Sequence, residues 1–269
     1  MTDDKLGNYT VQKPSFLRQL AMDSFAALPD GHPMTALMEL DVTDPLERIE
    51  ALRAEGVRVS LFAHVVRSIG VALSEHPKIN VVMHGRKFLY FEDVDINIPV
   101  EVKTADGHFP LQLVVRRAQD KTASEVYAVI ADAKAQHAAT GSTGAEDRWA
   151  RRLMGFARFI PRFLRIALIR LVIRNGKMVK QRSGTTLVTS VGKFASIPGF
   201  VTTFGPGPRG ATFALGSVVD KPVVRDGEVV VRKILSFTAI FNHDVVDGGP
   251  AARFGTRLRE LVESAEGLT

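Results

Sequence analysis

The stretch ILSFTAIFNHDVVDG, residues 234–248, places a histidine at the end of an uncharged run rich in β-branched and aromatic residues. Such a run is typical of a buried strand. The residues Gly-Gly-Pro then interrupt the pattern, and residues 251–263 resume with apolar residues at helical spacing. A general base must lie within hydrogen-bond reach of the proton that it removes, and a strand tip holds a side chain still. His243 is therefore the candidate base.

The composition is that of a globular protein and limits the chemistry. The chain has 269 residues, of which 45% are hydrophobic and 24% are charged. Because it has no cysteine, disulfides, a thiolate nucleophile and a cysteine zinc site are excluded. The first residues are acidic and polar, whereas a signal peptide is basic and then apolar. We therefore expect a cytoplasmic protein.

The charge is unevenly distributed along the chain. The net charge is +6, but no acidic residue lies between Asp147 and Asp220, an interval that holds 13 of the 35 Lys and Arg residues. The rest of the chain carries an excess of acidic residues. A local cationic surface indicates an anionic partner, and the options are a phosphate-bearing cofactor, an acidic carrier protein, anionic lipid or nucleic acid.

The order of the expected elements alternates helices with strands and hairpins. Mixed orders of this kind favour an α/β (α+β) fold in which helices cover a mixed central sheet. We expect helices at 14–27, 44–56 with Asp44 as N-cap, 60–76, 123–139 and 251–263, and strands at 34–42, 81–83, 87–91, 95–102, 111–115, 185–192, 211–219 and 234–241.

Residues 140–182 differ in composition from their surroundings. After a joint rich in Gly and Ser, the chain is rich in Leu, Ile, Phe and Arg, and a helical wheel groups Arg151, Arg158, Arg162 and Arg165. A transmembrane span is disfavoured, because each arginine costs roughly 2.5 to 3.5 kcal/mol at the bilayer centre. Three interpretations stay open: helices packed on the domain with a solvated arginine face, an anionic membrane surface bound through residues 148–182, or docking of an acidic protein. No nucleic-acid-binding signature accompanies the charge, so we expect no nucleic-acid partner.

The motif His243-x-x-x-Asp247-Gly248 between a buried strand and a helix resembles the active-site motif of the acyltransferase catalytic domain of 2-oxo acid dehydrogenase complexes. That family shares its fold with chloramphenicol acetyltransferase. The resemblance covers roughly residues 14–139 and 183–263. It implies a chloramphenicol acetyltransferase-like fold and a single catalytic domain, residues 1–269, with a basic amphipathic helical insertion at about 140–182. Further similar stretches follow in the same order: residues 39–43, 46–56, 62–77, 95–98, 106–107, 184–192 and 221–227.

The resemblance implies a coenzyme A-dependent acyltransferase. In this family the histidine, here His243, removes the proton from the thiol of coenzyme A or from a hydroxyl acceptor, and the nucleophile attacks an acyl thioester. A hydroxyl stabilises the oxyanion, and the matching position is Thr189, with Ser190 as the alternative. Adjacent strand residues point to opposite faces, so only one of the two serves. The family's site lies between subunits, which implies a homotrimer.

Three further residues are implied to support the site. Asp247, followed by Gly248, is mainly structural in the family and pairs with an arginine near the start of the domain, for which Arg18 is the expected partner. The residue after the base is usually arginine but is Asp244 here, and this carboxylate either raises the pKa of the imidazole or faces solvent. The other histidines lack ligand spacing, so we expect surface or packing roles and no metal site: His32, His64, His76, His84, His108 and His137.

The acyl carrier is expected to come from elsewhere. The resemblance begins almost at the start of the chain, so we expect no lipoyl group of its own, and an external lipoyl domain or another acyl carrier as partner. The last residues lack the apolar tail that joins family trimers into cages, which predicts an isolated trimer. The alternative is a non-catalytic trimeric scaffold that retains the fold and binds a membrane or a partner.

Overall fold

The structure, a computed structural model, describes residues 7–29, 31–104, 107–140, 157–192 and 198–268. Its centre is a six-stranded sheet in the order β1-β8-β7-β6-β4-β5, beside a two-stranded sheet, β2-β3. Strand β6 is parallel to its neighbours β4 and β7, and the other pairs are antiparallel, so the expected mixed sheet is confirmed. The strands are β1 (Pro33–Asp41), β2 (Val81–His84), β3 (Lys87–Tyr90), β4 (Ile96–Thr104), β5 (Gly107–Val115), β6 (Thr186–Ser190), β7 (Ala211–Arg225) and β8 (Glu228–Asn242).

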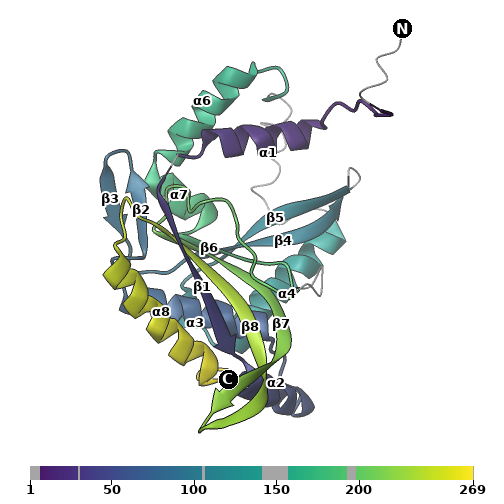
Figure 1. Cartoon of the computed structure of the whole chain (residues 1–269). Helices are drawn as coiled ribbons and strands as arrows, with labels where there is room; N and C mark the ends of the chain where they lie inside the picture. Colours follow the sequence, from purple (N-terminus) through teal and green to yellow (C-terminus); the bar gives the residue numbers. More distant parts are fainter. Residues whose placement is uncertain (1–6, 30, 105–106, 141–156, 193–197, 269) are drawn as a thin grey trace.

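Helices α3 and α8 pack on one face of the sheet and build the core there (Figure 1). Phe254 of α8 stacks on Phe213 of β7 at 5.6 Å and meets Phe241 of β8 edge-on at 5.9 Å. Burying one such side chain stabilises a fold by roughly 1.5 to 3 kcal/mol, so this cluster fixes the end of β8 that precedes His243. The helices are α1 (Phe16–Ala27), α2 (Thr43–Ala54), α3 (Leu61–Glu75), α4 (Ala123–Thr140), α6 (Arg162–Ile173), α7 (Gly176–Ser183) and α8 (Gly248–Glu263).

Two helices begin earlier than the sequence predicts. Helix α8 starts at Gly248 instead of residue 251, because Pro250 is tolerated in a first turn, where its missing N–H has no intrahelical partner. Helix α2 starts at Thr43, and Asp44 lies inside it instead of capping it. The carboxylate of Asp41 accepts hydrogen bonds from the backbone N–H of Thr43, at 3.1 Å, and from its hydroxyl, at 2.7 Å.

Asp41 also joins the end of β1 to the hairpin formed by β7 and β8. Its buried carboxylate accepts hydrogen bonds from Arg232 Nε at 2.8 Å and from Arg225 Nη2 at 3.0 Å. Burial by itself raises the pKa of Asp41, but the hydrogen bonds from Arg232, Thr43 and Arg225 outweigh it and lower the pKa to about 2. The carboxylate is therefore held in its charged form by the folded state.

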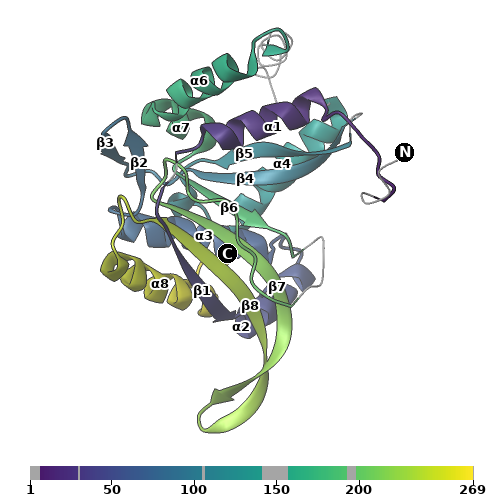
Figure 2. The ribbon, with the colours of Figure 1, turned by 45° about the horizontal axis from the view of Figure 1, so that its top comes forward.

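Helix α6 lies beside α1, apart from the helices that cover the sheet (Figure 2). The first part of the expected basic segment, residues 141–156, lies outside the described ranges. Asp23 of α1 is 1% exposed and accepts hydrogen bonds from Arg162 Nε at 3.0 Å and Arg165 Nε at 2.8 Å. Arg165 is itself buried. It therefore holds α6 to α1 and does not belong to a solvated arginine face.

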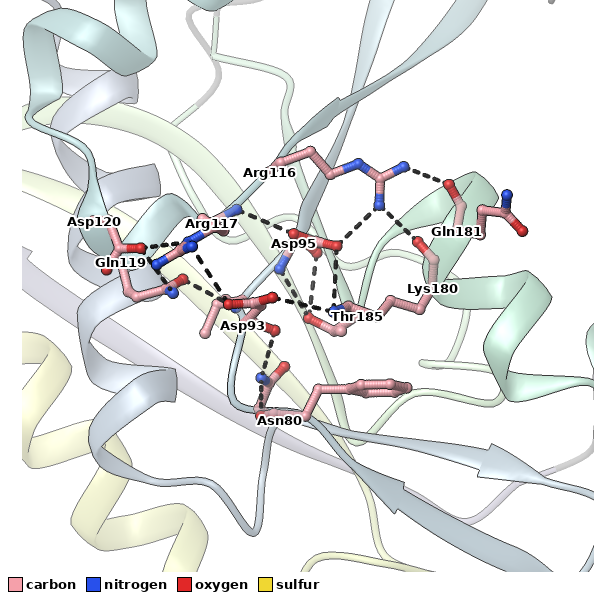
Figure 3. Close-up of polar contacts among 12 residues, drawn as sticks. Asn80, Asp93, Asp95, Arg116, Arg117, Gln119, Asp120, Lys180, Gln181 and Thr185 are labelled. Carbon is pink, nitrogen blue, oxygen red and sulfur yellow. Dashed lines mark hydrogen bonds and ion pairs between the residues drawn. The ribbon is translucent and has the colours of Figure 1, made fainter.

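Helix α7 is fastened to the sheet by a second charged cluster (Figure 3). Arg116 Nη1 donates to Asp95 Oδ2 and to the carbonyl of Lys180, both at 2.9 Å, while its Nη2 donates to the carbonyl of Gln181. The carbonyl of Lys180 also accepts from the N–H of Gly184 at 3.0 Å, and a cation is favourable here because the C-terminal end of a helix carries partial negative charge. At Gly184, φ is +68° and an added Cβ would lie 2.4 Å from the carbonyl oxygen of Asp95. Only glycine fits this junction without displacement of the backbone.

Candidate active site

His243 follows the last residue of β8, as the sequence predicts. Its backbone N–H donates to the carbonyl of His32 at 2.9 Å, and Val246 N–H donates to the carbonyl of Asn242, also at 2.9 Å. The backbone is thus held on one side by the strand that begins at Pro33 and on the other by a tight turn. The imidazole itself is 52% exposed, so a reactant can approach a base whose position is fixed.

Asn242 supports the turn from inside the protein. Its buried side chain donates from Nδ2 to the carbonyl of Gly207 at 3.2 Å, and its Oδ1 accepts from the backbone N–H of Asp244 at 3.1 Å. The side chain therefore joins the turn after β8 to the loop before β7. This role of Asn242 was not predicted from the sequence. The signal for it is a polar residue at the end of an apolar run.

Asp247 lies beside the base but is not buried in the single chain. Its Oδ1 is 3.9 Å from Nδ1 of His243, and its side chain is 87% exposed. Arg18 lies on an exposed side of α1, and within the described ranges no ion pair joins it to Asp247. Their pairing stays a prediction. Gly248 is the first residue of α8, and a Cβ added there would meet no atom within 4 Å.

Asp244 pairs with a histidine that the sequence reasoning did not connect to it. Its Oδ1 lies 2.8 Å from His32 Nδ1, at the surface, so the carboxylate is engaged by a neighbouring side chain. The surface position expected for His32 is observed. The pair follows from the β1–β8 register, in which Pro33 lies opposite Asn242, and this register cannot be read from either segment alone.

Thr189 and Ser190 point to opposite faces of β6, as strand alternation requires. Ser190 lies opposite Leu215 and lines a cavity of about 290 Å³ together with Phe62 and Leu235. It therefore faces the side of the sheet that α3 covers. Thr189 lies opposite Ala214 on β7. Ala214 lies opposite Thr238 on β8, and Thr238 lies opposite Leu37 on β1, so all four side chains point to the same face of the sheet. Leu37, at the end of this row, is 58% exposed. Thr189 thus points to the other side of the sheet.

The base and the candidate hydroxyls lie far apart within one chain. Thr189 pairs through Ala214 with Thr238, which precedes His243 by five residues on β8. At about 3.3 Å per residue and about 4.8 Å per strand, Thr189 and His243 are separated by roughly 20 Å. A single chain therefore does not bring them together.

The remaining histidines with described side chains pack against the fold. His64 is fully buried with Nε2 3.0 Å from the carbonyl of Val262, and burial lowers its pKa. His76 Nδ1 lies 2.9 Å from the carbonyl of Ala72, and His84 Nδ1 accepts from Gly176 N–H at 3.1 Å. The side chains of two others, at positions 108 and 137, are outside the description. Within the described ranges, no group of three or more His, Cys, Asp or Glu residues is placed to hold a metal ion.

Comparison with known sequences identifies relatives along most of the chain. The family model of the 2-oxoacid dehydrogenases acyltransferase (catalytic domain) matches residues 20–148 and 172–269. The lipoamide acyltransferase component of the branched-chain alpha-keto acid dehydrogenase complex of Bacillus subtilis is 26% identical over 87% of the chain. A dihydrolipoyllysine-residue acetyltransferase component from Zymomonas mobilis is 24% identical over 81%. The chain spans 47% and 41% of these two relatives.

Comparison with solved structures confirms the expected fold. The dihydrolipoamide acetyltransferase of Azotobacter vinelandii superposes with a TM-score of 0.70 at 19% identity, covering 100% of this chain and 97% of that one. A probable dihydrolipoamide acetyltransferase from Listeria monocytogenes gives 0.67 at 20% identity, with coverages of 97% and 96%. With its sheet, its histidine motif and the family match in agreement, the chain belongs to the 2-oxoacid dehydrogenase acyltransferase (catalytic domain) family.

Proposed function

We propose that the protein transfers an acyl group between coenzyme A and a thiol or hydroxyl acceptor, with His243 as general base. The observation that carries this proposal is the position of His243. Its backbone is fixed at the tip of a buried strand while its imidazole is half exposed, within the motif of an acyltransferase family. A base that is rigid and accessible is what proton abstraction needs.

The proposed reaction begins with transfer of the acceptor's proton to the imidazole of His243. The resulting thiolate or alkoxide attacks the carbonyl carbon of the acyl thioester and forms a tetrahedral oxyanion. A hydroxyl hydrogen bond stabilises this oxyanion, and Thr189 is the proposed donor, with Ser190 as the alternative. Collapse of the intermediate breaks the carbon–sulfur bond, and the departing thiolate takes the proton back from the imidazolium.

The hydroxyl is proposed to come from a second copy of the chain. Support comes from the roughly 20 Å that separate Thr189 from His243 within one chain, and from the side chain of Thr189, which is half-buried and points away from the face that α3 covers. A homotrimer with three such shared sites is the assembly we propose, and three copies per particle is the mass expected from light scattering. A 24-mer or a 60-mer would contradict an isolated trimer.

Asp247 is proposed to support the base, directly or by pairing with Arg18 in the assembled protein. In the Azotobacter vinelandii enzyme, a serine, a histidine and an asparagine were studied for their roles in the catalytic mechanism, and the asparagine follows the histidine by four positions. Position 247 has the same spacing from His243. We further propose an external lipoyl domain or another acyl carrier as the partner, since the curated relatives include lipoamide acyltransferase components.

The test is His243→Ala, assayed by transfer of acetyl from acetyl-coenzyme A to dihydrolipoamide. Loss of a general base typically lowers the rate by about 10²- to 10⁴-fold, and we expect a decrease of this size in kcat. The matched control is His84→Asn, which changes a packing histidine away from the proposed chemistry. Circular dichroism and particle mass should stay unchanged in both variants.

Two results would contradict the proposal. Full turnover by His243→Ala would exclude His243 as base. Absence of acyl transfer by the wild-type protein with a panel of acyl-coenzyme A donors and thiol and hydroxyl acceptors would favour the non-catalytic scaffold, and loss of His243 would then leave its cellular role intact.

A further inference from the structure

The outward face of α6 is apolar and is not covered by any other described part of the chain. On a helical wheel, Phe163, Leu164, Ala167, Leu168 and Leu171 fall on one side, and all are exposed. Phe163 and Leu171 are 76% and 68% exposed. The opposite side, which carries the buried Arg165, turns toward α1. A helix that presents apolar residues outward as well as inward has a surface left for a partner.

Basic side chains border this outward face. Arg170 and Arg174 are exposed, and no carboxylate of the described residues lies within ion-pair distance of them. Arg170 Nη2 also donates to the carbonyl of Ala26 at 3.1 Å, whereas Arg158 lies over the ring of Phe16 on the α1 side. Arg162 and Arg165, by contrast, share the carboxylate of Asp23. Because residues 148–219 contain no acidic residue, the positive charge around α6 is not offset along the chain. The surface therefore complements an anionic partner.

Most of α6 lies outside the part of the chain that the family model matches. The family model does not match residues 149–171, whereas it matches the sheet, α8 and the histidine motif. Asp23 nevertheless fixes α6 to α1, and Arg116 fixes α7 to the sheet. The face is thus presented by a firmly attached helix whose sequence is mostly outside the family match.

We propose that the outward face of α6 binds an anionic membrane surface. An amphipathic helix with Phe and Leu on one face and basic residues at its margin inserts its apolar side at the boundary between headgroups and acyl chains. None of the described helices is long and apolar enough to cross a membrane, so this association would be peripheral. Acyl transfer does not depend on it.

Anionic lipid is favoured over a second copy of the same face. Pairing of two identical faces would bring Arg170 and Arg174 of each chain close to their counterparts, and like charges in contact oppose association. In a cyclic trimer this face would instead meet a different surface of the neighbouring copy, an outcome that the particle mass of the variants tests. Anionic headgroups, in contrast, attract the same arginines while the acyl chains receive Phe163 and Leu171. One surface thus satisfies both kinds of side chain.

The test is flotation of the whole chain with phosphatidylglycerol–phosphatidylcholine vesicles and with pure phosphatidylcholine vesicles at low salt. We expect binding only to the anionic vesicles, weakened when salt shortens the screening length. Each basic residue near an anionic surface typically contributes about fivefold, so Arg170→Gln with Arg174→Gln should lower the partition coefficient about 30-fold. Phe163→Ser with Leu171→Ser should lower it at least about tenfold.

Matched controls use exposed residues elsewhere on the molecule. Val229→Ser with Val231→Ser removes two exposed apolar side chains from the β7–β8 hairpin, and Lys78→Gln with Arg86→Gln removes two exposed charges. Both controls should bind vesicles like the wild type. Unchanged acyl transfer and circular dichroism will show that every variant is folded.

Several outcomes would overturn the proposal. They are absence of wild-type binding to the anionic vesicles, equal binding to both vesicle types, and equal loss in the control variants. Two results together would show that a second copy of the chain occupies this face. The particle mass would fall in the variant Phe163→Ser with Leu171→Ser, and the wild type would not bind vesicles.

Discussion

At the scale of single residues, the alternation of β6 separates two neighbouring hydroxyls that the sequence leaves equivalent. Ser190 faces a cavity on the side covered by α3, and Thr189 faces the opposite side. Proximity in sequence therefore does not make the two interchangeable. Only the hydroxyl that reaches the reacting carbonyl can stabilise its oxyanion.

We predict that Thr189→Ala lowers kcat about 10²- to 10³-fold, the usual effect of removing an oxyanion donor. Ser190→Ala should lower kcat less than about tenfold, because its hydroxyl points to the other face. Thr189→Ser keeps the hydroxyl and should retain most of the activity. Steady-state acyl transfer by the three variants distinguishes the positions, and the reverse order of effects would make Ser190 the donor.

At the scale of elements, the buried carboxylate of Asp41 joins β1, the start of α2 and the β7–β8 hairpin. Hydrogen bonds to its charged form lower the pKa to about 2, below the ordinary value of 3.8. The unfolded chain therefore binds the proton more readily than the folded chain between these two values. The stabilisation is complete above about pH 4 and is lost as pH falls toward 2.

We predict that Asp41→Asn reduces the free energy of unfolding at pH 7 by about 2 kcal/mol. When the pH falls from 4 to 2, the free energy of unfolding should decrease less in this variant than in the wild type. Urea unfolding at several pH values measures both quantities. Asp220→Asn is the control, because Asp220 forms a solvent-exposed pair with Lys233, a kind of pair that contributes little. Parallel pH profiles for wild type and Asp41→Asn would refute the role of Asp41.

Elements with strong local patterns were predictable, and contacts between distant segments were not. The strand before His243 followed from an uncharged β-branched run, and the start of α3 from Ser60, whose hydroxyl accepts from Ala63 N–H at 3.2 Å. The pairs Asp23 with Arg165 and His32 with Asp244 join residues 142 and 212 positions apart. They depend on helix packing and strand register, which no local pattern specifies. Hence the wheel grouped Arg165 with solvated arginines although it is buried.

At the scale of the whole molecule, the separation of His243 from Thr189 distinguishes a shared site from a site within one chain. We predict that His243→Ala and Thr189→Ala chains, each inactive alone, recover activity when they are coexpressed as mixed trimers. In each mixed trimer, one of the three sites would combine an intact histidine from one chain with an intact threonine from the next, so we expect about a third of the wild-type activity per particle.

The measurement is acyl transfer per particle, after purification through a different affinity tag on each chain. The control mixes His243→Ala with the double variant that carries both changes, in which no intact site can form. If mixed trimers of the two single variants stay as inactive as this control, the site lies within one chain and the proposed sharing is wrong.

Because His243 and Thr189 lie far apart in one chain, a complete site needs two copies. Turnover would therefore depend on the concentration of the protein. A newly synthesised chain would carry two half-sites and would transfer acyl groups only slowly until it met its neighbours. On dilution below the dissociation constant of the trimer, specific activity would fall at saturating substrate, and it would return on concentration without refolding.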